Sequence, residues 1–288
     1  MSTIAMARER AAEFMHWGAD AQGSTRPLGL MRIALAVIVF ARFGSELSLY
    51  QGDSPAFLLL GAAFFVFSTM MLVGYMAETA CAGVAILLAT FQFHLGYMRG
   101  FPGWTSHHIY LLLVSVSLLA LSPCGRSFSL DRYRALATAQ SPREVSPEYG
   151  DLWTQRLIAL QLGALYFWTA VDKTNWHFLS GQRLQEAFIW SYSGSALEPL
   201  ISAGALLPML AVTVVVVEYF LAFGIFVRRW RPWVLPIGLA LHAVFYVLLP
   251  VSTYSATMMV LYLALLDPDE VHRFIDRMLG HDDAAHRL

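Results

Sequence analysis

Cysteine, lysine and charged side chains are all scarce in this chain of 288 residues. Its two cysteines, Cys81 and Cys124, form no CxxC pair and cannot build a disulfide framework. The net charge of −1, without a basic and aromatic groove pattern, argues against nucleic acid as a partner. No signal-peptide core with a small-residue cleavage site follows the N-terminus, so we expect the first apolar run to remain as an anchor.

What the chain has in abundance is apolar sequence. Hydrophobic residues make up 57% and charged residues only 14%, which is not typical of a soluble globular domain. A helix that crosses the hydrocarbon core needs roughly 20 apolar residues, and such runs recur along nearly the whole chain. We therefore predict an all-α fold, a polytopic transmembrane helical bundle of about eight spans. The predicted spans are Leu28–Leu49, Pro55–Met76, Thr79–Met98, His108–Ser122, Leu152–Asp172, Leu207–Val227, Trp233–Leu249 and Tyr254–Leu266.

Two longer connections interrupt this series of spans. The polar stretch Pro123–Asp151 is predicted to be a surface loop with a short interfacial helix. In Lys173–Leu206, the residues Leu184, Phe188 and Tyr192 recur at helical spacing, which indicates an interfacial or re-entrant helix after the fifth span.

The arginines predict the orientation in the membrane, because positively charged short loops stay in the cytoplasm. Arginines concentrate in alternate connections, which places both termini in the cytoplasm and the Lys173–Leu206 connection outside. We expect a multi-pass protein of a bacterial inner membrane, with a cytoplasmic segment 1–27, a transmembrane domain 28–266 and a cytoplasmic tail 267–288. The arginines on the predicted inner side are Arg8, Arg10, Arg26, Arg126, Arg132, Arg134, Arg143, Arg228, Arg229, Arg231, Arg273, Arg277 and Arg287.

Lys173 is the only lysine in the chain, and it ends the fifth predicted span. One interpretation is an interfacial anchor whose stem lies in the bilayer while the amine reaches water. The other is a general base, because a desolvated lysine, unlike arginine, can lose its proton. Asp172 beside it favours the charged amine, so the residues alone leave both interpretations open.

Histidines form a second group of candidates near the predicted outer face. His107 and His108 open the fourth span, and adjacent residues on a helix point about 100° apart. That geometry suits one histidine in a pocket better than two ligands on one metal. A zinc or copper site built from His94, His107, His108 and His177 is an alternative, but no HxxxH or HExxH spacing supports it, and we expect no metal.

Ionisable residues inside spans form a third group: Arg42 with Glu46, Glu218, and His242. Charged groups are costly in hydrocarbon and usually face the bundle interior or a water-filled cavity. Arg42 and Glu46, four apart on one helix face, can neutralise each other. Glu218 and His242 are interpreted either as a structural pair that links two helices or as part of a functional site.

The order of several short motifs resembles a known family, the horizontally transferred transmembrane (HTTM) domain proteins, which include the vitamin K-dependent γ-glutamyl carboxylase. The resemblance covers most of Leu28 to Leu266 and differs at Asp172 and Thr174. Its motifs are Leu28-Gly29-Leu30-Met31-Arg32-Ile33-Ala34, His107-His108-Ile109-Tyr110, Ser122-Pro123, Ser127-Phe128-Ser129-Leu130-Asp131-Arg132, Gln161-Leu162, Tyr166-Phe167, Lys173 with Gly181, Glu218 and Leu241-His242.

This resemblance implies Lys173 as the base that deprotonates a quinol and His108 as a second catalytic residue that supports carbanion or CO2 chemistry. It implies reduced vitamin K or another quinol as the cofactor. The candidate substrate-binding residues are His107, Tyr110, Tyr166, Asp172, Glu218, His242 and Arg42.

Three functions therefore stand as hypotheses. The first is a vitamin K-dependent carboxylase-like or epoxidase-like enzyme that acts on a quinol or lipidic substrate at the outer face. The second is a non-catalytic membrane factor for maturation, export or immunity of a secreted or membrane peptide. The third is a carrier for protons or a small solute. Membrane lipid is an expected partner in each case.

Overall fold

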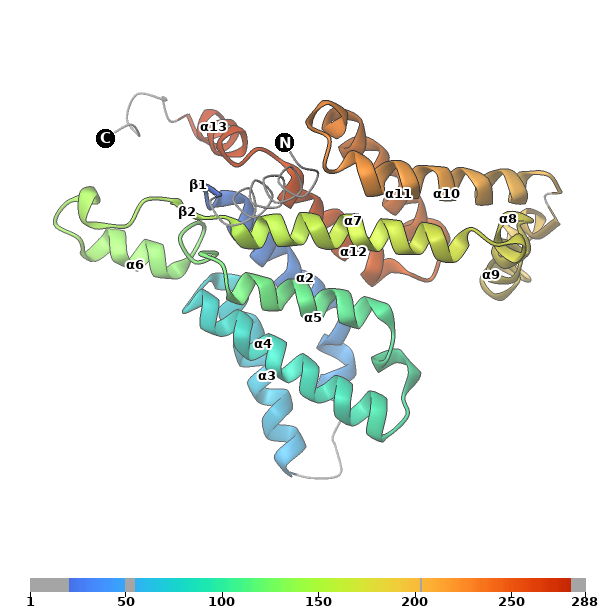
Figure 1. Cartoon of the computed structure of the whole chain (residues 1–288). Coiled ribbons are helices and arrows are strands. Elements are labelled where there is room, and N and C mark those ends of the chain that lie inside the picture. The colour runs from blue at the N-terminus through green and yellow to red at the C-terminus, as the bar shows by residue number, and fades with distance from the viewer. Residues whose placement is uncertain (1–20, 50–54, 203, 281–288) are drawn as a thin grey trace, which may run out of the picture. The chain divides into compact units, whose positions relative to one another are not determined.

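A computed structural model describes residues 21–49, 55–202 and 204–280. In this part of the chain the fold is all-α, as predicted, apart from one short pair of antiparallel strands (Figure 1). The elements are β1 (Gln22–Ser24), α2 (Arg26–Leu49), α3 (Pro55–Val73), α4 (Ala77–Phe91), α5 (His107–Ala120), α6 (Leu130–Thr138), β2 (Tyr149–Asp151), α7 (Trp153–Lys173), α8 (Trp176–Leu179), α9 (Gln182–Tyr192), α10 (Leu206–Gly224), α11 (Arg231–Leu248), α12 (Ser252–Leu261) and α13 (Pro268–Met278).

Each predicted span corresponds to a helix. A π-helix, Gln92–Met98, extends α4, and a 3-10 helix, Tyr262–Leu265, extends α12. Six helices among the described residues are long and apolar enough to cross a membrane, by length and composition. These six do not include α7, which carries Gln155, Arg156 and Gln161, or the shorter apolar helix Ser252–Leu265.

Helices are also present in both of the longer connections, as α6 and α9. Other predictions fall outside the described residues. These are the arginines Arg8, Arg10 and Arg287, the connection 51–54 and the side chain of Glu46.

The chain divides into two compact units. Unit 1 comprises residues up to Ile158 together with those from Leu266 onward, and unit 2 is Ala159–Leu265. In unit 1, helices α2, α3, α4 and α5 pack in sequence order, and α2 also packs against α5. The C-terminal helix α13 returns to pack against β1 and α2. The residues of unit 2 are thus inserted within the sequence of unit 1.

Polar contacts close unit 1 where its first and last segments meet. Strand β1 pairs with β2, with Gly23 opposite Gly150. The buried Arg26 guanidinium donates to Glu148 Oε2 at 2.9 Å and to Asp276 Oδ1 at 2.7 Å. A buried arginine needs such carboxylate partners, because an unpaired charge away from water is strongly destabilising.

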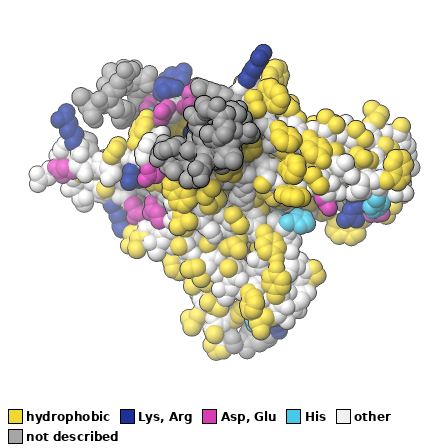
Figure 2. Space-filling view, in the orientation of Figure 1, with side chains coloured by type: hydrophobic (Ala, Val, Ile, Leu, Met, Phe, Trp, Pro, Cys, Tyr) yellow, Lys and Arg dark blue, Asp and Glu magenta, His cyan; other side chains and the backbone are white. Residues whose placement is uncertain are grey.

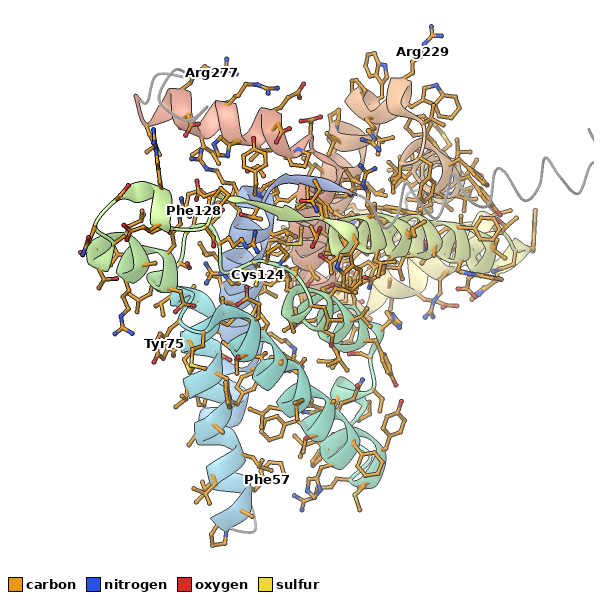
Figure 3. The ribbon with its side chains drawn as sticks, turned by 60° about the vertical axis from the view of Figure 1, so that its left-hand side comes forward. Phe57, Tyr75, Cys124, Phe128, Arg229 and Arg277 are labelled. Atoms are coloured by element: carbon orange, nitrogen blue, oxygen red, sulfur yellow. The ribbon has the colours of Figure 1, made fainter. Side chains whose placement is uncertain are left out.

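A second buried arginine, Arg32, ties α2 to the end of α3. Its guanidinium donates to the carbonyl oxygens of Met71 and Phe128, each at 2.7 Å. Gly74 is required beside it, since a Cβ there would lie 2.4 Å from an Arg32 nitrogen. Phe128 lies in the turn after α5, where Figure 3 labels both Phe128 and Cys124. Its φ of 51° is a left-handed conformation that is costly for phenylalanine. The Arg32 contact helps to hold this turn.

The surface of unit 1 separates apolar from charged regions. In the view of Figure 2, charged side chains gather around α6 and α13, while hydrophobic side chains cover α3. Leu59 of α3, for example, is 71% exposed. Exposed leucine on so apolar a helix is expected where the surrounding solvent is lipid.

Unit 2 is built around α10. Helices α8 and α9 pack against it, and α10, α11 and α12 pack in sequence order. Gly181 has φ of 83°, and a Cβ at this position would lie 2.7 Å from the backbone nitrogen of Pro208, so the packing requires glycine. Tyr192 at the end of α9 donates to the carbonyl oxygen of Leu248 at 2.6 Å. These contacts fix the segment that follows Lys173.

Candidate functional site

The sequence-predicted site residues fall into both units. Arg42, His107, His108 and Tyr110 belong to unit 1, whereas Tyr166, Asp172, Lys173, Glu218 and His242 belong to unit 2.

In unit 2 the central feature is an ion pair between Lys173 and Glu218. The Lys173 ammonium donates to both carboxylate oxygens, with Nζ 2.8 Å from Oε1 and 3.0 Å from Oε2. The carboxylate side chain is 4% exposed and the lysine side chain 23% exposed. The pair joins the end of α7 to the middle of α10. Glu218 is buried, as predicted, and its ion-pair partner is Lys173.

Local structure explains why Lys173 stands at this position. Helix α7 ends at Lys173, and Asn175 then caps α8 by accepting from the backbone N–H of Phe178 at 3.0 Å. A cation at a helix C-terminus is favoured by the helix dipole. The ring of Phe178 lies 5.9 Å from Nζ, a second contact that favours the charged amine.

Next along α7, Tyr166 is the centre of a buried triad with His242 of α11 and Tyr262. Its hydroxyl lies 2.6 Å from Nε2 of His242 and 2.5 Å from the Tyr262 hydroxyl. All three side chains are at most 2% exposed. The other ring nitrogen of His242, Nδ1, has no hydrogen-bond partner among the described residues.

Gly238 makes this triad possible. A Cβ at Gly238 would lie 1.7 Å from the Tyr262 hydroxyl oxygen, so only glycine leaves room for that hydroxyl beside α11. The triad corrects one sequence-based interpretation. His242 is buried, as predicted, but its hydrogen-bond partner is Tyr166, while Glu218 pairs with Lys173.

Tyr262 and Gly238 were missed by the sequence analysis. A tyrosine in an apolar span indicates a buried polar contact, because a buried hydroxyl needs a hydrogen-bond partner. Glycine inside the helical pattern of α11 is a weaker signal of close packing. Asp172, in contrast, has an exposed side chain in the structure.

The unit 1 candidates lie around the start of α5. His107 is exposed and His108 is half-buried, with ring centroids 5.7 Å apart. Arg42 is close enough to act electrostatically on His108. Tyr110 shares a hydrogen bond with Tyr97 of the π-helix, and Nδ1 of His108 is buried without a partner in the described part of the chain.

Neither unit gathers a metal site from its described residues, since no group of three or more His, Cys, Asp or Glu side chains lies together there. His177, one of the four histidines of the zinc or copper alternative, lies 2.9 Å from Glu186 through Nε2. That bond and a second from Arg183 lower the pKa of the Glu186 carboxyl group.

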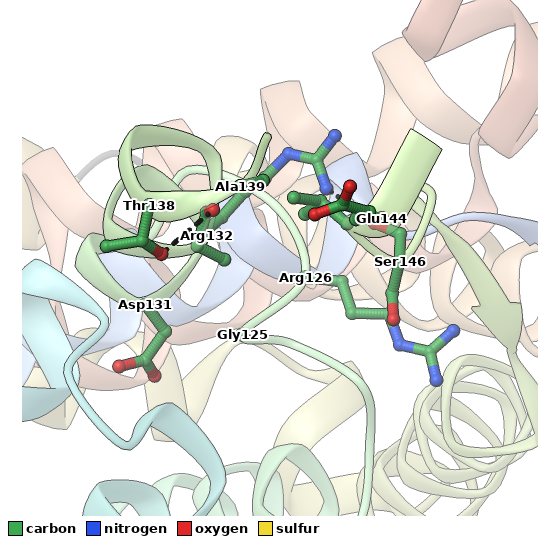
Figure 4. A pocket seen from close by; sticks show the side chains of 10 residues that line it. Gly125, Arg126, Asp131, Arg132, Thr138, Ala139, Glu144 and Ser146 are labelled. Carbon is green, nitrogen blue, oxygen red and sulfur yellow. Dashed lines mark hydrogen bonds between the residues drawn. The ribbon is translucent and has the colours of Figure 1, made fainter. Parts of the chain in front are cut away.

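A pocket of about 510 Å³ opens in unit 1 beside α6 (Figure 4). It contains none of the predicted site residues. Its arginines have local roles, since Arg132 donates to the carbonyl oxygen of Ser146 at 2.8 Å and Arg126 to that of Tyr149. The lining residues are Gly125, Arg126, Asp131, Arg132, Ala135, Thr138, Ala139, Glu144, Val145 and Ser146.

Apolar helices of spanning length and buried polar groups between them define a polytopic helical membrane protein. The HTTM domain model matches residues 27–269, so the chain belongs to the HTTM domain family, which is related to the vitamin K-dependent carboxylase. No curated protein and no solved structure matches it.

Proposed function

We propose that this HTTM protein binds a quinol or another lipidic substrate and removes a proton from it through Lys173, at the outer face of a bacterial inner membrane. The observation that carries the proposal is the Lys173–Glu218 pair, in which the lysine side chain is partly exposed and the carboxylate is buried. An amine that is held by a buried carboxylate is suited to acid–base chemistry on a hydroxyl group.

Family membership supports the same chemistry, because the resemblance gives Lys173 the role of base and His108 a supporting catalytic role. Reduced vitamin K or another quinol is the proposed cofactor. The apolar surroundings suit such a ligand, since the pair lies on α7 and α10 and Phe178 contacts the lysine.

Substitution of Lys173 tests the proposal. Lys173→Arg keeps the charge and most of the stem, but a guanidinium does not release its proton, so this variant should be abundant and inactive. Lys173→Ala should be inactive as well. The assay is the cellular phenotype of gene deletion, scored together with protein abundance.

Full complementation by Lys173→Arg at normal abundance would show that the residue is an interfacial anchor, and the base mechanism would have to be abandoned. Mass spectrometry of lipids retained by the purified protein would identify the substrate class independently. Retained quinone supports the proposal, whereas a co-purified peptide supports the non-catalytic maturation or immunity factor.

A proton carrier is the second candidate, favoured by one observation. Unit 2 buries Glu218, His242 and Tyr166 along two neighbouring helices and α7, and buried ionisable groups in membrane helices commonly mark proton paths. Reconstitution into liposomes with a pH-sensitive dye inside distinguishes the two functions. Proton flux that Glu218→Gln abolishes would support the carrier.

A further inference from the structure

The ion pair has an asymmetry that bears on which group finally holds a substrate proton. Glu218 is 4% exposed and Lys173 is 23% exposed, so an incoming molecule can reach the amine but not the carboxylate. The ammonium has three N–H groups, and two of them are directed to the oxygens of Glu218. The remaining N–H is the available contact for a substrate oxygen.

The groups around Lys173 attract a cation, and an ammonium can take up a substrate proton only as it gives another proton up. The adjacent carboxylate, the end of α7 and the Phe178 ring all stabilise a cation at Nζ. The carboxylate has the opposite preference, because burial away from water disfavours its ionised form. In this pair the carboxylate is therefore the group with the capacity to gain a proton.

We infer that Glu218 is the net proton acceptor of the site and that Lys173 passes the substrate's proton to it. This inference rests on the proposed function for its substrate, a molecule with an acidic hydroxyl group. Glu218 acts through Lys173 and does not touch the substrate, so it positions the ammonium and takes the proton that the ammonium gives up.

The substrate O–H bond breaks and a new N–H bond forms at Nζ, while another Nζ–H bond breaks and an O–H bond forms on Glu218. Lys173 remains an ammonium and Glu218 becomes a neutral carboxylic acid. The substrate gains one negative charge and the pair gains one positive charge, so the total is unchanged. The retained ammonium then stabilises the substrate oxyanion by direct contact.

The simpler mechanism, in which Lys173 alone is the base, makes the opposite prediction for one substitution. Without the carboxylate, Lys173 would lose its proton more readily, so Glu218→Gln should preserve or raise activity. If Glu218 is the acceptor, Glu218→Gln leaves the ammonium with no group to receive its proton, and activity is lost.

The first experiment compares complementation of the deletion phenotype by Glu218→Gln, Glu218→Asp and the control Glu186→Gln, at matched abundance. Glu186 is an exposed glutamate of the same unit that also pairs with basic side chains. We expect loss with Glu218→Gln, partial retention with Glu218→Asp and no change with the control. Complementation by Glu218→Gln while Lys173→Arg fails would overturn the inference alone. If Lys173→Arg also complements, the proposed function itself fails.

A spectroscopic measurement on the purified protein separates proton acceptance from a structural role. Lys173→Met removes the ammonium, and the buried Glu218 should then take up a proton at neutral pH. The infrared carboxylic acid C=O band should appear in Lys173→Met and be missing in the double variant Lys173→Met with Glu218→Gln. A Lys173→Met protein without this band would show that Glu218 stays ionised and would overturn the inference.

Discussion

Replacement of Gly238 by alanine tests the packing that supports the buried tyrosine–histidine triad. A Cβ at this position would lie 1.7 Å from the Tyr262 hydroxyl oxygen, whereas real Cβ contacts below 3.0 Å are essentially never observed. The hydroxyl must therefore move by at least 1.3 Å, the difference between 3.0 and 1.7 Å. A displacement of that size breaks the 2.5 Å hydrogen bond to Tyr166.

The expected loss of stability combines the cost of overpacking, the cost of a broken hydrogen bond and the higher helix propensity of alanine. Overpacking a well-packed interior costs about 1–3 kcal/mol, and a broken buried hydrogen bond costs about 1–3 kcal/mol more. Alanine is preferred over glycine inside a helix by roughly 0.5–1 kcal/mol, which offsets part of this. We expect a net loss of about 1.0–5.5 kcal/mol in the free energy of unfolding.

Thermal unfolding of the purified protein in detergent measures this loss, and Gly238→Ala should unfold several degrees below the parent protein. Gly61→Ala is the matched control, because a Cβ at Gly61 in α3 meets nothing within 4 Å and should leave the Tm unchanged or slightly raised. In a Tyr262→Phe background the substitution should cost less, because the hydroxyl and its hydrogen bond to Tyr166 are already gone and only the clash with the ring carbons remains. Equal melting of the Gly238→Ala and Gly61→Ala proteins would refute the packing argument.

Three further predictions concern other parts of the chain. Arg26→Met removes the guanidinium that joins Glu148 to Asp276. Arg132 and His272 still contact these carboxylates at 3.5 and 3.2 Å, so we expect a loss of about 1.5–3 kcal/mol for the lost charge-assisted hydrogen bonds, and unchanged melting would contradict this. Both native cysteines are buried, so cysteines introduced at Ala137 and Ser195 can be labelled selectively. If α7 crosses the membrane, the two introduced cysteines should be labelled from opposite sides of the membrane. Labelling of both from the same side would show that α7 does not span it. Gly181→Ala should also destabilise the protein, because φ is 83° and the new Cβ would contact the Pro208 nitrogen at 2.7 Å; a melting temperature equal to that of the parent would refute it.

Much of the fold could be predicted from the sequence because a lipid environment demands long apolar helices. The predicted span Pro55–Met76 corresponds to α3, and Trp233–Leu249 corresponds to α11, each within a few residues. Their ends follow from glycine, proline and polar turns. Periodicity could not predict that α13 returns to pack against β1 and α2, since that contact joins the two extremes of the chain.

The candidate site was predictable in its members but not in its pairings. Lys173, Glu218 and His242 were each identified because ionisable groups are rare and costly in apolar helices. Which of them meet depends on the rotation of α7, α10 and α11 about their axes, and one sequence does not specify this rotation. The sequence therefore allowed Glu218 with His242, whereas the structure pairs Glu218 with Lys173 and His242 with Tyr166.

The insertion of unit 2 between Ile158 and Leu266 sets an order for biosynthesis. A ribosome makes helices α2 to α5 first, yet Arg26 acquires its Asp276 partner only after the whole of unit 2 has been translated. Until then a guanidinium that ends up buried lacks one of its two carboxylates. Unit 1 must therefore wait in an incomplete form during synthesis, and a chain cut short before α13 would remain in that form and be a target for membrane quality-control proteases.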